Sequence, residues 1–162
     1  MDIGKLSKNN IIDFMKKNAE GLRKNPDLPK NDTQNVAEKI EKFAENLTEI
    51  PGETLEQAIL HLQTKESLCR KINNICNYTR MGCSAETIAA QFIFKSSIFS
   101  AIGAIAFTGA TAASLIYQLK ANDTEVLTRK LNEWGYLYAE QLTLEKLTKS
   151  KTNDMKPEKP DI

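Results

Sequence analysis

A long uncharged segment constrains this chain more than any other feature. Residues 96–118 read SSIFSAIGAIAFTGATAASLIYQ and contain no Asp, Glu, Lys or Arg, while Lys95 precedes them and Lys120 lies just beyond. As an α-helix the segment would be roughly 35 Å long at ~1.5 Å per residue, enough to cross a bilayer core of about 30 Å. Because a helix that is apolar all round is buried in lipid or in protein, we expect one of these two environments.

Small residues recur at every fourth position of this segment in two rows. Such rows let two helix backbones approach closely within lipid. More than half of the segment is Ala, Gly, Ser or Thr, and it contains a single Leu, which leans toward burial in protein. We predict that the rows pack against the rest of the fold or against a second copy of the chain. They consist of Ser100, Ala104, Thr108 and Ala112, and of Ala106, Ala110 and Ser114.

A second pattern in the segment is a weak amphipathic stripe with the four-three spacing of a helix seam. If the protein is a soluble bundle, this stripe is predicted to pack against neighbouring helices, with the hydroxyl side opposite. A third state joins the two readings: a bundle that opens and inserts its central helix. If the helix crosses once, the basic residues at its two ends are nearly balanced and hardly fix an orientation. The stripe consists of Ile98, Ile102, Ile105, Gly109, Ala112, Ile116 and Leu119.

Apolar periodicity predicts an all-α chain of about five helices packed as a bundle. The first covers about 7–24, and the second begins at an N-cap type, Asp32 or Thr33. The third starts at Thr54 and runs to about Arg80, where Gly82 is predicted to end it. The second helix carries the most regular seam, with spacings of four and three. That seam is Val36, Ile40, Phe43, Leu47 and Ile50.

The fourth helix is the hydrophobic one, predicted over Ile88–Leu119, and the fifth opens at Asn122-Asp123-Thr124. The last residues are polar, bear prolines and lack periodicity, which is typical of a disordered tail. The predicted organisation is an N-terminal amphipathic unit (1–83), the hydrophobic helix (84–120), a C-terminal amphipathic helix (121–150) and the tail (151–162).

Composition and spacing argue against several functions. With 22 basic and 21 acidic residues in 162, bulk charge does not favour nucleic acid. Cys69, Cys76 and Cys83 stand at intervals of seven, about 10 Å apart on a helix, too far for a disulfide and too widely spaced for usual zinc ligands. We predict that they are small buried residues on one helix face.

No pattern in the sequence indicates catalysis. His61 is the only histidine, and no glycine-rich phosphate loop is present. The acidic residues between Glu38 and Glu56 are typical of a solvated helix face. We therefore expect a protein that is not an enzyme and that uses no cofactor or metal ion.

The aromatic residues Trp134, Tyr136 and Tyr138 cluster on the fifth predicted helix. The simpler interpretation is that Trp134 anchors the core. In the alternative, Tyr136 points away from the other two rings and the group forms a contact surface for a protein partner.

Three functional hypotheses follow. The first is a non-catalytic, membrane-associated interaction protein whose hydrophobic helix anchors or inserts in a bilayer. The second is a soluble helical-bundle adaptor, cytoplasmic or secreted, with that helix buried. The third is a secreted effector or toxin acting on host membranes. The Lys- and Asn-rich composition and the hydrophilic C-terminal tail resemble those of bacterial type IV secretion effectors, and virulence is what that resemblance implies.

Overall fold

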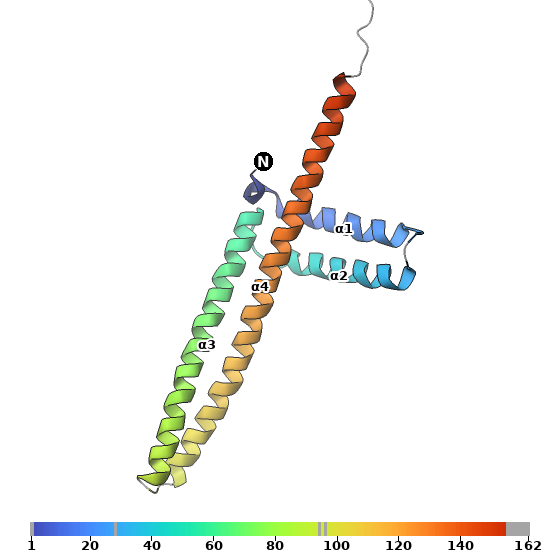
Figure 1. Ribbon diagram of the computed structural model, residues 1–162. Coiled ribbons are helices and arrows are strands. Elements are labelled where there is room, and N and C mark those ends of the chain that lie inside the picture. The colour runs from blue at the N-terminus through green and yellow to red at the C-terminus, as the bar shows by residue number, and fades with distance from the viewer. Residues whose placement is uncertain (1, 28, 94, 96, 155–162) are drawn as a thin grey trace, which may run out of the picture. The chain divides into compact units, whose positions relative to one another are not determined.

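The computed structural model describes residues 2–27, 29–93, 95 and 97–154, and these are all-α (Figure 1). A short 3-10 helix, η1 (Ile3–Lys5), precedes four α-helices. These are α1 (Lys8–Lys24), α2 (Lys30–Thr48), α3 (Leu55–Phe92) and α4 (Ser97–Asp154). The helices form two compact units, one made of the residues up to His61 with those from Arg129 onward, and one made of Leu62–Thr128.

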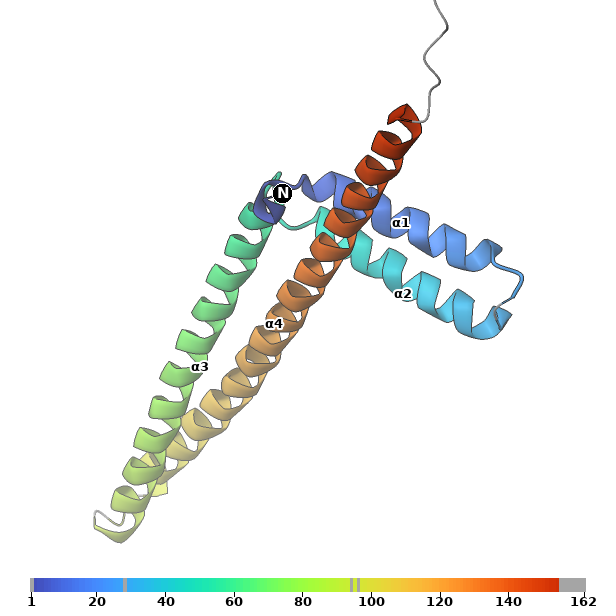
Figure 2. The same cartoon turned by 45° about the horizontal axis from the view of Figure 1, so that its top comes forward.

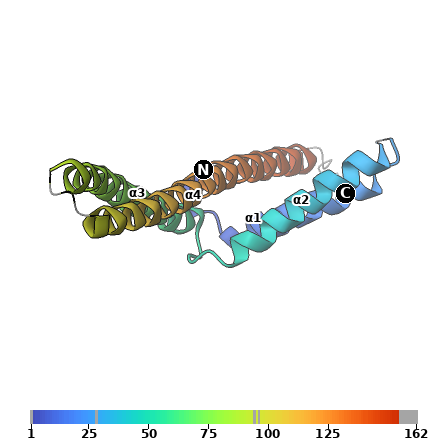
Figure 3. The same cartoon turned by 90° about the horizontal axis from the view of Figure 1, so that it is seen from below.

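In the first unit, α1 and α2 lie side by side, as Figures 1, 2 and 3 agree. Asn25 has extended backbone and ends α1, as expected for a residue before proline. Arg23 on α1 and Glu41 on α2 form a two-pronged ion pair, with N–O distances of 2.6 and 2.7 Å. The buried apolar residues of this unit are Leu6, Ile11, Ile12, Met15, Ala19, Ala37, Phe43, Ala44, Leu47, Ile50, Leu55, Ala58, Leu131 and Ala139.

The predicted seam of α2 is only partly its buried face. Phe43 and Leu47 are buried, whereas Val36 is exposed, because Ala37 and Ala44 face the core beside them. The helix also begins earlier than predicted, after Pro29 as its N-cap. The hydroxyl of Thr33 donates to the Pro29 carbonyl within the first turn, so it does not cap the helix.

The N-terminal residues are tied to the start of α3 by backbone hydrogen bonds. Lys8 N–H donates to the Glu53 carbonyl and Leu55 N–H donates to the Leu6 carbonyl, each at 2.8 Å. The buried amine of Lys8 also donates to the Ile50 carbonyl. The hydroxyl of Thr54 accepts from the Gln57 N–H at 3.3 Å, so the predicted start of α3 is confirmed.

The second unit is an antiparallel hairpin of α3 and α4 (Figures 1 and 2). The predicted end of the third helix at Gly82 is wrong. Gly82 lies inside α3, because a glycine costs a helix interior only about 1 kcal/mol and the residues after it still favour helix. Lys95 in the turn has the positive φ angle of 48°.

The predicted break at Asn122-Asp123-Thr124 is also wrong, since α4 is continuous there. The Thr124 hydroxyl donates 2.7 Å to the Lys120 carbonyl of its own helix and caps nothing. The predicted hydrophobic helix is therefore divided, because its residues 88–92 belong to α3 and its residues from Ser97 onward belong to α4. α4 continues to Asp154, and the part of the predicted tail at 155–162 lies outside the described residues. The all-α prediction is confirmed.

Candidate functional site

The contact between α3 and α4 in the second unit is made by small and polar residues. On α4 the buried positions follow one another at heptad-like intervals, and Ala110 between them is half-buried. Facing positions on α3 are also small or polar, except for Leu62 at the start of the unit. The buried residues are Gly103, Ser114, Ala121 and Thr124 on α4 and Leu62, Cys69, Cys83 and Ala90 on α3.

The three cysteines occupy one face of α3, as their spacing of seven predicts. Cys69 and Cys83 are buried and Cys76 is half-buried, and all three are free thiols. Among the described residues no group of three or more His, Cys, Asp or Glu side chains is placed to hold a metal ion.

Gly103 marks a very close approach of the two helices. A Cβ atom at this position would lie 2.3 Å from the Thr87 Oγ1 atom, well inside van der Waals contact. The Thr87 hydroxyl is held there because it donates 2.7 Å to the Cys83 carbonyl. Gly109, two turns further along α4, has nothing within 4 Å of its Cβ position.

Polar contacts further along the hairpin fix the pairing of the helices. Ser114 Oγ lies 2.6 Å from Asn73 Oδ1 and 3.0 Å from Asn77 Oδ1. Arg70 pairs with Glu66 on its own helix and with Glu125 on α4, each at 2.7 Å. The hydrogen bond that Arg70 donates to the Glu66 carboxylate, followed by the charges of both carboxylates, raises the pKa of the Arg70 guanidinium.

The outside of this hairpin is apolar. Most of the large apolar side chains that are exposed in the described residues belong to this unit, and Ile105 and Phe92 are 74% and 75% exposed. The predicted packing of Ile98, Ile102 and Ile105 against neighbouring helices is thus wrong. The face of α4 with small side chains packs against α3, and the face with these large side chains is exposed. The other members of this surface are Leu68, Ile75, Tyr78, Met81, Ile88, Ile93, Phe99, Phe107, Leu115, Ile116, Leu119 and Val126.

α4 includes a stretch that is long and apolar enough to cross a membrane. Only 11% of that stretch is buried, whereas the core helix of a soluble protein is mostly buried. The predicted small-residue rows divide between two environments. Ser114 is buried, Ser100 and Ala110 are half-buried, and the remaining members, Ala104, Thr108, Ala112 and Ala106, are exposed.

The predicted aromatic group lies on the part of α4 that belongs to the first unit. Phe14 of α1 contacts Trp134 edge-on, with ring centroids 5.9 Å apart, and contacts Tyr138 at 5.3 Å. Trp134 and Tyr138 are half-buried by these contacts, whereas Tyr136 is 62% exposed. No pattern in the sequence indicates that Phe14 joins this group.

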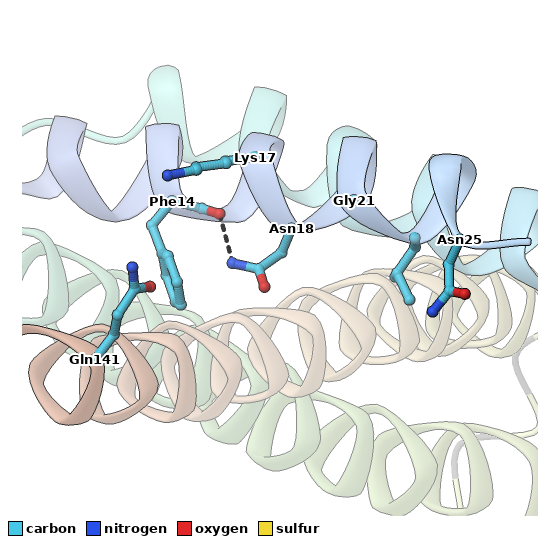
Figure 4. A pocket seen from close by; sticks show the side chains of 7 residues that line it. Phe14, Lys17, Asn18, Gly21, Asn25 and Gln141 are labelled. Atoms are coloured by element: carbon cyan, nitrogen blue, oxygen red, sulfur yellow. Dashed lines mark hydrogen bonds between the residues drawn. The ribbon is translucent and has the colours of Figure 1, made fainter. Parts of the chain in front are cut away.

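An open groove of about 360 Å³ lies beside Phe14, between α1 and α4 of the first unit (Figure 4). Lys17 supplies its one charged group. The amides of Asn18, Asn25 and Gln141 supply hydrogen-bonding groups, although Asn18 already donates 2.8 Å to the Phe14 carbonyl. The groove thus offers polar contacts, and a second open groove that shares Phe14, Lys17 and Gln141 with it adds Asp13, Tyr138 and Glu145.

No protein-family model matches this chain, and neither a curated protein nor a solved structure matches it. The effector hypothesis therefore rests on composition alone.

Proposed function

We propose that this protein is a non-catalytic, membrane-associated helical protein whose α3–α4 hairpin enters a lipid bilayer. The observation that carries the proposal is the reversed burial of residues 62–128. Apart from Leu62 at the start of the unit, small and polar side chains fill the contact between the two helices, and most large apolar side chains face outward. Within lipid, helices associate through close packing of small residues and interhelical hydrogen bonds, and their large apolar residues face the acyl chains.

The free energy of transferring apolar side chains out of water favours lipid as the material that covers the hairpin. Moving an Ile or Phe side chain fully from water to apolar surroundings gains about 1.5–3 kcal/mol. Soluble monomers rarely expose large contiguous apolar patches for this reason. The hairpin exposes such side chains on both helices, so acyl chains would cover all of them at once.

The first unit has the burial pattern of a water-soluble fold, since most of its large apolar residues are buried or half-buried, although some, such as Leu137, Leu144 and Leu147, are exposed. We propose that it stays in the aqueous phase and binds a protein partner. The exposed ring of Tyr136 and the groove beside Phe14 and Lys17 support this role, since exposed aromatic side chains are frequent contact points in interfaces.

A second candidate function is a soluble adaptor whose hairpin is covered by protein, either a partner or a second copy of this chain. Arg80 and Glu86 favour it, because ionised side chains are costly within a membrane-spanning segment. The length and low burial of the apolar stretch of α4 favour the membrane.

Fractionation of cells that express the full chain without detergent separates the two functions. We expect the wild type in the membrane fraction, and we expect Ile105→Asp to lower the bound fraction by about tenfold, since a carboxylate would enter lipid. Leu144→Asp, at an exposed site of the first unit, is the matched control and should stay bound. A monodisperse wild-type protein in the soluble fraction would support the adaptor instead.

A further inference from the structure

We infer, on the basis of the membrane association proposed above, that α3 crosses the bilayer together with α4. The hairpin then enters from one side and returns to it, so the N-terminal and C-terminal parts of the chain lie on the same side. The turn around Lys95 would reach the opposite surface. Among the residues that the structure describes, hydropathy selects α4 alone as a candidate span, so this arrangement goes beyond what the apolar segment indicates.

The first unit supplies the main reason, because its core is built from residues on both sides of the hairpin in the sequence. Phe14 contacts the rings of Trp134 and Tyr138. A Cβ atom on Gly135 would lie 2.6 Å from the Leu55 Cδ2 atom, so α4 and the start of α3 are in tight contact. A single crossing by α4 would separate all of these partners by the thickness of the membrane. Two crossings keep them together.

The pairing of the two helices is consistent with a complete double crossing. Three contacts at successive levels of the hairpin keep the same register between α3 and α4. They are Thr87 with Gly103, Asn73 with Ser114, and Arg70 with Glu125. In this register Arg70 lies near the level of Lys120. From that level to the turn, about 23 residues of α4 span roughly 35 Å at ~1.5 Å per residue. This length matches a bilayer core of about 30 Å, with basic residues at both boundaries.

The outward face of α3 also suits lipid along this length. Its exposed residues include Ile75, Tyr78, Met81, Ile88 and Phe92. Hydropathy misses this face because it averages all sides of the helix.

The polar residues of α3 divide between two sides: Asn73, Asn77, Arg80, Ser84 and Thr87 are half-buried, whereas Asn74, Thr79, Glu86 and Gln91 are exposed. Asn73, Arg80 and Thr87 are seven residues apart and so share one side of the helix, the side on which Asn73 and Thr87 contact α4. Arg80 is half-buried, and the exposed Glu86 carboxylate is the main charge left to oppose insertion. A single crossing would avoid Glu86 but would dismantle the core of the first unit, which we judge the larger loss.

Side-specific thiol labelling tests the arrangement. In a chain whose three cysteines are replaced by Ala, with helicity checked by circular dichroism, single cysteines are placed by Lys16→Cys, Ser97→Cys and Glu140→Cys. All three sites are exposed. Each protein is added to preformed phosphatidylcholine vesicles, and an impermeant maleimide is supplied either outside or trapped in the lumen. We expect the Lys16→Cys and Glu140→Cys variants to react only from outside and the Ser97→Cys variant to react only from the lumen.

Each other outcome has a distinct meaning. Labelling of the Lys16→Cys and Glu140→Cys variants from opposite sides would show a single crossing and overturn the inference while leaving membrane association intact. Protection of the Ser97→Cys variant from both reagents would show a hairpin that stops within the bilayer, which also overturns the double crossing. Labelling of all three variants from outside, with no protein bound to vesicles, would overturn the proposed function itself.

Discussion

The Ser114 hydroxyl on α4 lies 2.6 Å from the side-chain amide oxygen of Asn73 on α3. The amide of Asn77 is 3.0 Å away on its other side. Both contacts are to amide oxygens, which accept, so the one proton of the Ser114 hydroxyl is donated toward these two oxygens. These residues link the two helices of the hairpin at a buried position.

Ser114→Ala should loosen the hairpin, because it leaves two half-buried amides without this partner. We expect a loss of about 1 kcal/mol and faster amide hydrogen exchange in α3 around Asn73. Thr108→Ala is the control, since the exposed Thr108 hydroxyl donates to the Ala104 carbonyl of its own helix. Equal exchange rates in both variants would show that Ser114 does not hold the helices together.

Gly103→Ala should also weaken the hairpin. The added methyl group would displace the Thr87 hydroxyl from its bond to the Cys83 carbonyl, and overpacking of this kind costs about 1–3 kcal/mol. Gly109→Ala adds the same group in open space and should stabilise the helix by up to about 1 kcal/mol. Denaturant titrations of the two variants by circular dichroism should give opposite shifts. Shifts of the same sign would contradict the close approach at Gly103.

Phe14→Ala should destabilise the first unit by about 2 kcal/mol, through lost burial and the loss of two ring contacts. Trp134 is the only tryptophan, so its fluorescence reports this unit directly. We expect a red-shifted emission and a lower urea midpoint. Tyr136→Ala, at an exposed ring of the same helix, should leave both unchanged.

Glu86→Gln should strengthen membrane binding, because it removes the one exposed charge that the described part of the hairpin carries between Arg80 and the turn. Removing an ionised group from a membrane-spanning segment is expected to raise vesicle partitioning by about tenfold. Glu140→Gln in the first unit serves as the control. Unchanged partitioning of Glu86→Gln would place Glu86 outside the lipid.

Part of this fold could be predicted from the sequence, and the rest could not for identifiable reasons. The interval of seven between the cysteines indicates one helix face, and the lack of charge in 96–118 indicates an unusual environment. Which face of that helix is buried could not be predicted, because the stripe with Ile102 and Ile105 and the buried positions Gly103 and Ser114 both follow helical spacing. Periodicity defines faces, and only the partner helix decides which one is buried.

The helix boundaries illustrate a second limit. Gly82 is of a residue type that ends helices and Asn122 is of a type that begins them, yet both lie inside long helices here. The Ser114 partners are also 37 and 41 residues away in the sequence. Long-range packing outweighs such local preferences, and a single sequence does not encode it as a readable pattern.

Flotation with lipid vesicles tests the central claim most directly. Purified wild-type protein is mixed with neutral phosphatidylcholine vesicles and centrifuged through a density gradient, with its helicity followed by circular dichroism. We predict that the folded protein rises with the vesicles, because lipid covers the outer face of the hairpin around Ile105 and Phe92. Folded protein that stays at the bottom of the gradient would contradict this account.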